Sequence, residues 1–218
     1  MPADQLAMTM PVEHDNSEIA QLREHGEQAL AEIISSYNDR LLRIIDLRLA
    51  PQLSGRVDAA DVLQEVFLEA RKRLPRFLRD ASVPVFVWLR GVVLDTLVHV
   101  HRRHLGAKMR DAGRELPLHA GGGPQATSVS LAGFLIGDLT SPSQAAMRQE
   151  LATRIEVTLA AMDEIDREVL ILRHFEQLSN DEVSSVIGVK KAAASRRYMR
   201  ALARFREVLS AVPGFEDD

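Results

Sequence analysis

The sequence predicts an all-α protein: two small helical bundles joined by a flexible linker, the C-terminal bundle containing a helix-turn-helix. Three observations favour this fold class. Apolar residues recur every three or four positions, and no strand-like alternation persists. Aromatic residues make up only 5% of the chain. A segment rich in Gly, Pro and Ser separates two helix-forming regions, as linkers do.

The 218 residues, 46% of them apolar, suffice for one large domain or two small ones. We expect a flexible leader over residues 1–16, the first bundle over 17–105, a linker over 106–140 and the second bundle over 141–212. In the first bundle, apolar spacing predicts two helices between Ser17 and Leu49, and Ala50-Pro51 ends the second of them.

The stretch from residue 56 to residue 77 follows, and its helical spacing predicts a buried stripe of Val62, Val66, Ala70 and Leu74, with Leu63 and Phe67 beside it. Polar and acidic residues occupy mostly the opposite side. The spacing of Asp61 and Glu65 could suit a metal or acid–base pair, but no His partner accompanies them. A solvated or partner-facing surface is therefore favoured over a catalytic one.

Pro75 and Pro84 bracket an expected loop, and residues 85–104 are again helical. This helix carries His99, His101 and His104, which raises the possibility of a zinc site. The adjacent arginines would repel a cation and no fourth ligand is evident, so we expect no metal. We expect no cofactor and no catalysis either, because no nucleophile–base pair is recognisable.

Residues 178–209 predict two helices joined by a tight turn. Ser179 and Glu182 have the spacing of a capping box, and Gly188 stands where a left-handed turn residue is needed. The second helix has its apolar positions on one arc, at Ala194, Tyr198, Ala201, Leu202, Phe205 and Leu209. A short helix, a glycine turn and a longer helix are what a helix-turn-helix requires.

The second of these helices is strongly basic. Four arginines share one arc: Arg196, Arg197, Arg200 and Arg204. No acidic residue four positions away balances them, so nucleic-acid binding is favoured over a merely solvated face. The net charge of −4 is compatible with DNA binding because the charges are segregated along the chain: residues 1–36 are acidic and residues 190–206 are basic.

Secreted, disulfide-rich and membrane-spanning proteins are the classes that the sequence disfavours. It contains no cysteine, no signal-peptide pattern and no apolar run of membrane-spanning length. These features fit a reducing cytoplasm and no membrane partner.

Two motifs, in order, resemble those of the extracytoplasmic-function sigma factors, the minimal two-domain initiation factors of bacterial RNA polymerase. Residues 58–67 (DAADVLQEVF) are similar to the family's core-binding run, followed by Leu74-Pro75 and Trp88-Leu89. Residues 182–189 (EVSSVIGV) resemble the family's helix-turn-helix, and residues 166–170 (DREVL) the run before it. Asp95 departs from the pattern, since the family's promoter-melting helix typically has Asn there.

The resemblance implies binding to core RNA polymerase, at the clamp helices of its largest subunit, and to promoter DNA. An anti-sigma factor is a further partner that it suggests. The implied polymerase-binding residues are Asp58, Asp61, Gln64 and Glu65. Those implied for the minus-ten element are Arg79, Trp88, His99, Arg102 and Arg103, although an inward-facing core role is favoured for Trp88. Those for the minus-thirty-five element are Lys190, Lys191, Ser195, Arg196, Arg197, Arg200 and Arg204.

Two other classes stay open at the level of the sequence. A helix-turn-helix activator with a helical sensing domain would bind duplex DNA without polymerase. An adaptor or anti-sigma factor would not need the basic stripe.

Overall fold

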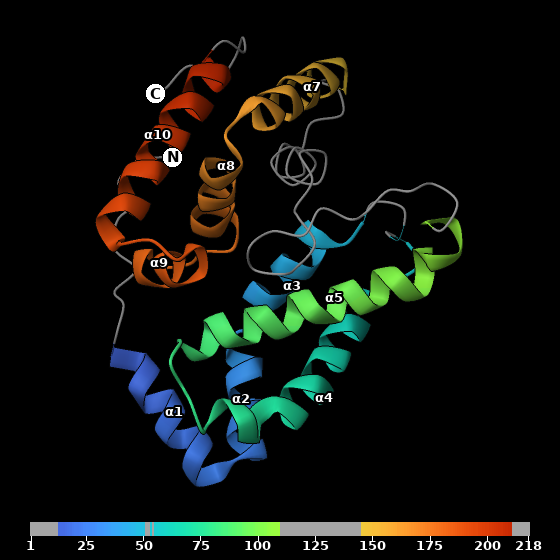
Figure 1. Cartoon of the computed structure of the whole chain (residues 1–218). Coiled ribbons are helices and arrows are strands. Elements are labelled where there is room, and N and C mark those ends of the chain that lie inside the picture. Colours follow the sequence, from blue (N-terminus) through green and yellow to red (C-terminus); the bar gives the residue numbers. More distant parts are fainter. Residues whose placement is uncertain (1–12, 51–52, 54, 110–144, 211–218) are drawn as a thin grey trace. The chain divides into compact units, whose positions relative to one another are not determined.

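The computed structural model describes residues 13–50, 53, 55–109 and 145–210. Every regular element among these residues is a helix, which confirms the all-α prediction (Figure 1). The helices belong to two compact units. One holds α1 to α5, and the other holds α7, α8, a π-helical turn, most of α9, and α10.

The first unit begins with three helices rather than the expected two: α1 (Glu13–His25), α2 (Glu27–Ser36) and α3 (Asn38–Arg48). The prediction missed the break at Gly26, whose φ of +54° is left-handed and cannot continue a right-handed helix. Apolar periodicity runs through such a break, because residues on both sides face one core. Leu22, Leu30, Leu41 and Ile45 are all fully buried in it.

Helices α4 (Ala59–Phe77) and α5 (Val85–Met109) pack side by side and complete this unit (Figure 1). Asp58 caps α4 by accepting a hydrogen bond from the Ala60 N–H at 2.8 Å. The predicted stripe of Val62, Val66, Ala70 and Leu74 is buried.

The expectation that a loop starts at Pro75 is wrong, because α4 continues through it to Phe77. Proline removes one backbone hydrogen bond there. The turn persists because Leu74 and Phe77 are both buried.

The second unit contains α7 (Ala145–Ala161), α8 (Glu164–Leu170), a π-helical turn η3 (Ile171–Phe175), α9 (Asn180–Ile187) and α10 (Lys191–Ser210). Asp163 caps α8, accepting from the backbone N–H groups of Ile165 and Asp166. The core joins Ile155, Leu159, Val169, Leu172 and Phe175 to Ala194, Ala201 and Phe205 of α10. α10 packs on α7 and α8.

The predicted segment boundaries differ from the helix ends by a few residues. α1 begins at Glu13, inside the expected leader, and α5 extends to Met109, inside the expected linker. Composition marks the middle of a helix better than its ends. The rest of the leader and of the linker, over 1–12 and 110–144, lies outside the described residues, and so does the weak helix expected at 131–136.

Candidate functional sites

The helix-turn-helix has the local geometry that its sequence predicts. Ser179 Oγ accepts from the Glu182 N–H at 3.2 Å, and the Glu182 carboxylate accepts from the Ser179 N–H at 2.6 Å. This capping box starts α9. Gly188 ends it at φ +66° and ψ +32°, a left-handed conformation that glycine adopts without the strain of a Cβ atom.

The start of α10 is tied to α9 by two side chains. Asn180 donates from Nδ2 to the Lys191 carbonyl at 3.1 Å, and the Lys191 ammonium pairs with Asp181 at 2.5 Å. These contacts hold the N-terminal end of the candidate recognition helix in a defined direction. They also place the Lys191 ammonium, a predicted DNA contact, in an ion pair with Asp181.

The basic face of α10 divides into two kinds of arginine. Arg196 and Arg204 are exposed, and no hydrogen bond or ion pair of the described residues involves them. Arg197 and Arg200 both donate to the carboxylate of Asp166 on α8. No acidic residue lies four positions away along α10, as the sequence shows, but the inference that the whole stripe is uncompensated is wrong for Arg197 and Arg200. The acid comes from a helix packed against it.

Other residues on this face remain accessible. Lys190 and Ser195 are exposed, and Met199 is 61% exposed between Arg196 and Arg200. Met199 is not among the residues that the sequence predicts to bind DNA. An apolar side chain within an otherwise basic arc is the signal that could have found it.

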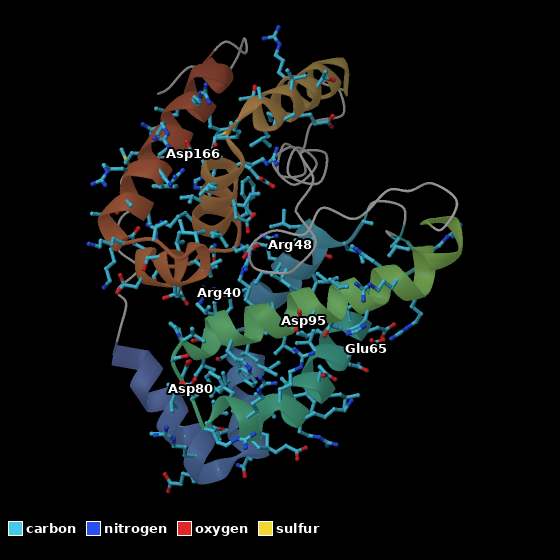
Figure 2. The ribbon with its side chains drawn as sticks, in the orientation of Figure 1. Arg40, Arg48, Glu65, Asp80, Asp95 and Asp166 are labelled. Carbon is cyan, nitrogen blue, oxygen red and sulfur yellow. The ribbon has the colours of Figure 1, made fainter. Side chains whose placement is uncertain are left out.

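On α4, the four residues assigned to polymerase differ in their surroundings. Asp58 is exposed and caps the helix. Asp61 and Gln64 are exposed, with no hydrogen bond or ion pair to any other described residue. Glu65 lies on the side of α4 that faces α5 and accepts two hydrogen bonds from the Arg103 guanidinium, at 2.8 and 3.1 Å (Figure 2). This hydrogen bonding lowers the pKa of Glu65 from its ordinary value.

Next to Gln64, an apolar groove of about 580 Å³ opens between α2, α3 and α4. Leu42, Leu63, Phe67 and Leu68 contribute apolar walls, and Leu68 is 47% exposed. Leu63 and Phe67, which the helical spacing predicts to lie beside the buried stripe, are half-buried at the surface of the groove. The sequence feature that could have predicted this groove is Leu68, an apolar residue of α4 that lies outside the buried stripe.

The residues assigned to the minus-ten element all come from α5 or from the loop between α4 and α5. Arg79, His99, Arg102 and Arg103 are exposed. Trp88 is half-buried, and its ring stacks on Phe77 with centroids 4.3 Å apart and planes 9° from parallel. One face of the indole is therefore covered, as expected for a side chain that holds α5 to α4.

Asp95 belongs to an ion-pair network across α4 and α5. Arg73 donates to Asp95 at 2.5 Å and to Glu69 at 2.9 Å (Figure 2). Hydrogen bonding to Arg73 lowers the pKa of Glu69. A carboxylate at this position, where the resembling family has Asn, thus acquires an arginine partner within the same unit.

The three histidines of α5 do not converge. His101 is 1% exposed and its Nε2 accepts from the Ala50 N–H at 3.1 Å, whereas His99 and His104 are exposed. Within the described ranges, no three His, Asp or Glu side chains gather as a metal site would require. In the same part of the chain, no helix combines the length and apolar character needed to cross a bilayer.

The second unit matches a known domain family. The profile described as "Sigma-70, region 4" covers residues 152–205, which include the end of α7, the α8 carboxylate and the helix-turn-helix. The matched residues include the helix-turn-helix of α9 and α10 up to Phe205.

Whole-length relatives extend the match to both units. The ECF RNA polymerase sigma factor SigD of Mycobacterium tuberculosis is 27% identical over 205 residues, covering 94% of this chain and 88% of that protein. The RNA polymerase sigma factor CnrH of Cupriavidus metallidurans is 28% identical over 202 residues, 92% and 97% of the two chains. The solved structure of CnrH with the cytosolic domain of CnrY has a similar fold, with a TM-score of 0.50 at 19% identity over 90% and 97% of the chains. Because the motifs, the order of the two units and these relatives agree, the chain is similar over most of its length to the extracytoplasmic-function sigma factors.

Proposed function

We propose that this chain is an alternative sigma factor that binds the RNA polymerase core with its first unit and selects promoters with both units. The observation that carries the proposal is the helix-turn-helix: a capped α9, a left-handed Gly188, and an α10 that presents Arg196 and Arg204 without internal partners among the described residues. The N-terminal part of a recognition helix enters the major groove. The minus-thirty-five element would be its target, contacted by Lys190, Lys191, Ser195, Arg196, Arg197, Arg200 and Arg204.

The polymerase core would bind the outer surface of α4. Asp58, Asp61 and Glu65 supply negative charge, Gln64 supplies an amide, and the groove beside Gln64 supplies apolar contact area. Such a surface suits a helical partner with basic and apolar side chains, because the charges orient it and the groove supplies the burial. The clamp helices of the largest polymerase subunit are the partner that the resemblance to extracytoplasmic-function sigma factors indicates.

The minus-ten element would lie along the surface formed by Arg79, Trp88, His99, Arg102 and Arg103. Arginines there can neutralise the backbone of a separated strand. The Trp88 face that is not stacked on Phe77 offers a platform for one base. Since the proposed partner is the polymerase, we expect the protein to act in the cytoplasm, without cofactor or catalysis, under the control of an anti-sigma factor.

The test is reconstitution with purified core polymerase. We expect the chain to bind core and to direct transcription from a subset of a promoter library, with no transcription when either component is left out. A helix-turn-helix activator would instead bind duplex promoter DNA tightly on its own and depend on another sigma factor. Failure to bind core would contradict the proposal.

A further inference from the structure

One carboxylate of the second unit is buried against the DNA-binding helix. The Asp166 side chain on α8 is only 5% exposed, and it faces α10 (Figure 2). It accepts from Arg200 Nε at 2.5 Å, from Arg200 Nη2 at 2.6 Å and from Arg197 Nη1 at 3.0 Å. Asp163, at 3.7 Å from Arg197, adds a weaker ion pair.

The pairing with Arg200 uses only one edge of its guanidinium. Nε and one hydrogen of Nη2 point to Asp166, so the end edge, with Nη1 and the second Nη2 hydrogen, stays available. The Arg200 side chain is 58% exposed. A planar pair of parallel N–H donors is the group that reads the O6 and N7 atoms of guanine in the major groove.

The environment of Asp166 keeps this arrangement in place at neutral pH. Hydrogen bonds from Arg200, and secondly from Arg197, hold the pKa of Asp166 below its ordinary value, so the carboxylate stays ionised. A free arginine samples many rotamers, and ordering it on DNA costs conformational entropy. An arginine already held by a buried carboxylate has lost much of that freedom before DNA binds.

We propose that Asp166 is a positioning residue for promoter reading: it orients Arg200, with Arg197 as its second ligand, so that the end edge of Arg200 reads one guanine of the promoter. The inference rests on the proposed function, since it requires the second unit to bind promoter DNA. Pre-orientation favours a guanine edge over a phosphate, because a base edge accepts two donors in one plane only. Asp166 would then determine specificity without contacting DNA.

The test uses the full chain with core polymerase and a promoter library randomised across the minus-thirty-five element. Asp166→Asn should reduce the preference for guanine at one position by roughly tenfold. Binding to random duplex DNA should be unchanged or stronger, because a negative charge is removed. Arg200→Ala should lose preference at the same position, and the double variant should lose no more than either single one.

Glu156→Gln on α7 is the matched control. It removes one negative charge from the same unit, and neither arginine contacts Glu156. It should change non-specific binding as Asp166→Asn does and leave the base preference intact. Asp166→Glu is the second variant, since it keeps the charge but moves the guanidinium by about one methylene; it should relax the preference while melting near the wild type.

Three results would overturn the inference. Asp166→Asn could weaken all promoters equally and in proportion to a lost melting temperature, which would make the carboxylate only a bond between α8 and α10. It could strengthen all promoters with their ranking preserved, which would make Asp166 a competitor of phosphate. Arg200→Ala could leave every base preference intact. If wild-type protein selects no promoter with core polymerase, the proposed function itself fails, and this outcome is distinct from the other three.

Discussion

Glu65 and Arg103 satisfy each other in the isolated first unit, although one is assigned to polymerase and the other to DNA. Both side chains are about half exposed, and solvent-screened pairs of this kind contribute little to stability. Breaking this ion pair therefore costs little free energy when polymerase binds Glu65 or DNA binds Arg103. Asp61, one turn earlier, has no competing partner among the described residues and is the simpler of the two acids to test.

Reversing the charge at Asp61 and Glu65 should weaken binding to core polymerase, because like charges would then face a basic surface. We expect the Asp61→Lys, Glu65→Lys double variant to lose at least about tenfold in affinity, with helical content unchanged by circular dichroism. The control is Glu24→Lys, an exposed acid of α1 in the same unit. Wild-type affinity in the double variant would contradict the assignment of α4.

His101 makes the stability of the first unit depend on pH. Burial lowers its pKa below the ordinary 6.5, so the unfolded chain takes up a proton more readily than the folded one. Above about pH 6.5 the imidazole is neutral in both states, and the contribution of His101 to the free energy of unfolding is complete. This contribution is lost as the pH falls through the lower pKa of the folded state. Below pH 6.5 the free energy of unfolding should fall by at most about 1.4 kcal/mol per pH unit from this residue.

Urea unfolding followed by the fluorescence of Trp88, the single tryptophan, reports this unit alone. His101→Gln keeps an acceptor for the Ala50 N–H and does not titrate, so its midpoint should depend less on pH between 7.5 and 5.0. Equal slopes in the two proteins would show that His101 does not control the acid response.

At the scale of the element, Arg196 and Arg204 of α10 differ in their distance from the helix N-terminus, and we expect them to contact DNA differently. Arg196 lies near the helix N-terminus and Arg204 two turns later, and both are exposed. We expect Arg196→Ala to cost about 1–3 kcal/mol on preferred promoters and to relax one base preference. Arg204→Ala should weaken all promoters alike and lower the salt slope by about one. Binding titrations over a series of salt concentrations distinguish the two, and exchanged behaviours would refute the assignment.

The turn between α9 and α10 depends on the backbone of Gly188. A Cβ atom there would meet nothing within 4 Å, so any cost of Gly188→Ala comes from the left-handed conformation alone. That cost is about 1–2 kcal/mol. Asn tolerates the conformation better, so Gly188→Asn should restore part of the loss. Hydrogen exchange of α9 amides measures the effect; equal protection in the two variants would mean that strain at Gly188 is not what limits the turn.

At the scale of the whole molecule, the chain consists of two compact helical units, and the prediction that residues 106–140 form a linker stays a prediction. If it holds, limited proteolysis should first cut between residues 110 and 144 and release two helical fragments. Mass spectrometry identifies the cut, and circular dichroism of the fragments reports their folding. Resistance across residues 119–130 would mean instead that this segment is protected in the native protein.

The sequence by itself determined the fold class and the position of the helix-turn-helix, because these depend on local information. Apolar periodicity, the spacing of Ser179 and Glu182 and the glycine at 188 each act within one or two helical turns, and the structure has all three. The acidic side of α4 was predictable for the same reason. The break at Gly26 and the helical Pro75 were not predicted, since burial on both sides decides whether a chain bends or continues there.

Only the tertiary structure decided which charges are free. Asp166 lies 31 and 34 positions before the two arginines that it binds, and Glu65 lies 38 before Arg103, so no spacing rule along one helix could pair them. The groove beside Gln64 likewise needs three helices to form its walls. Contacts between helices depend on how their faces pack, and packing is a property of the folded unit rather than of any segment.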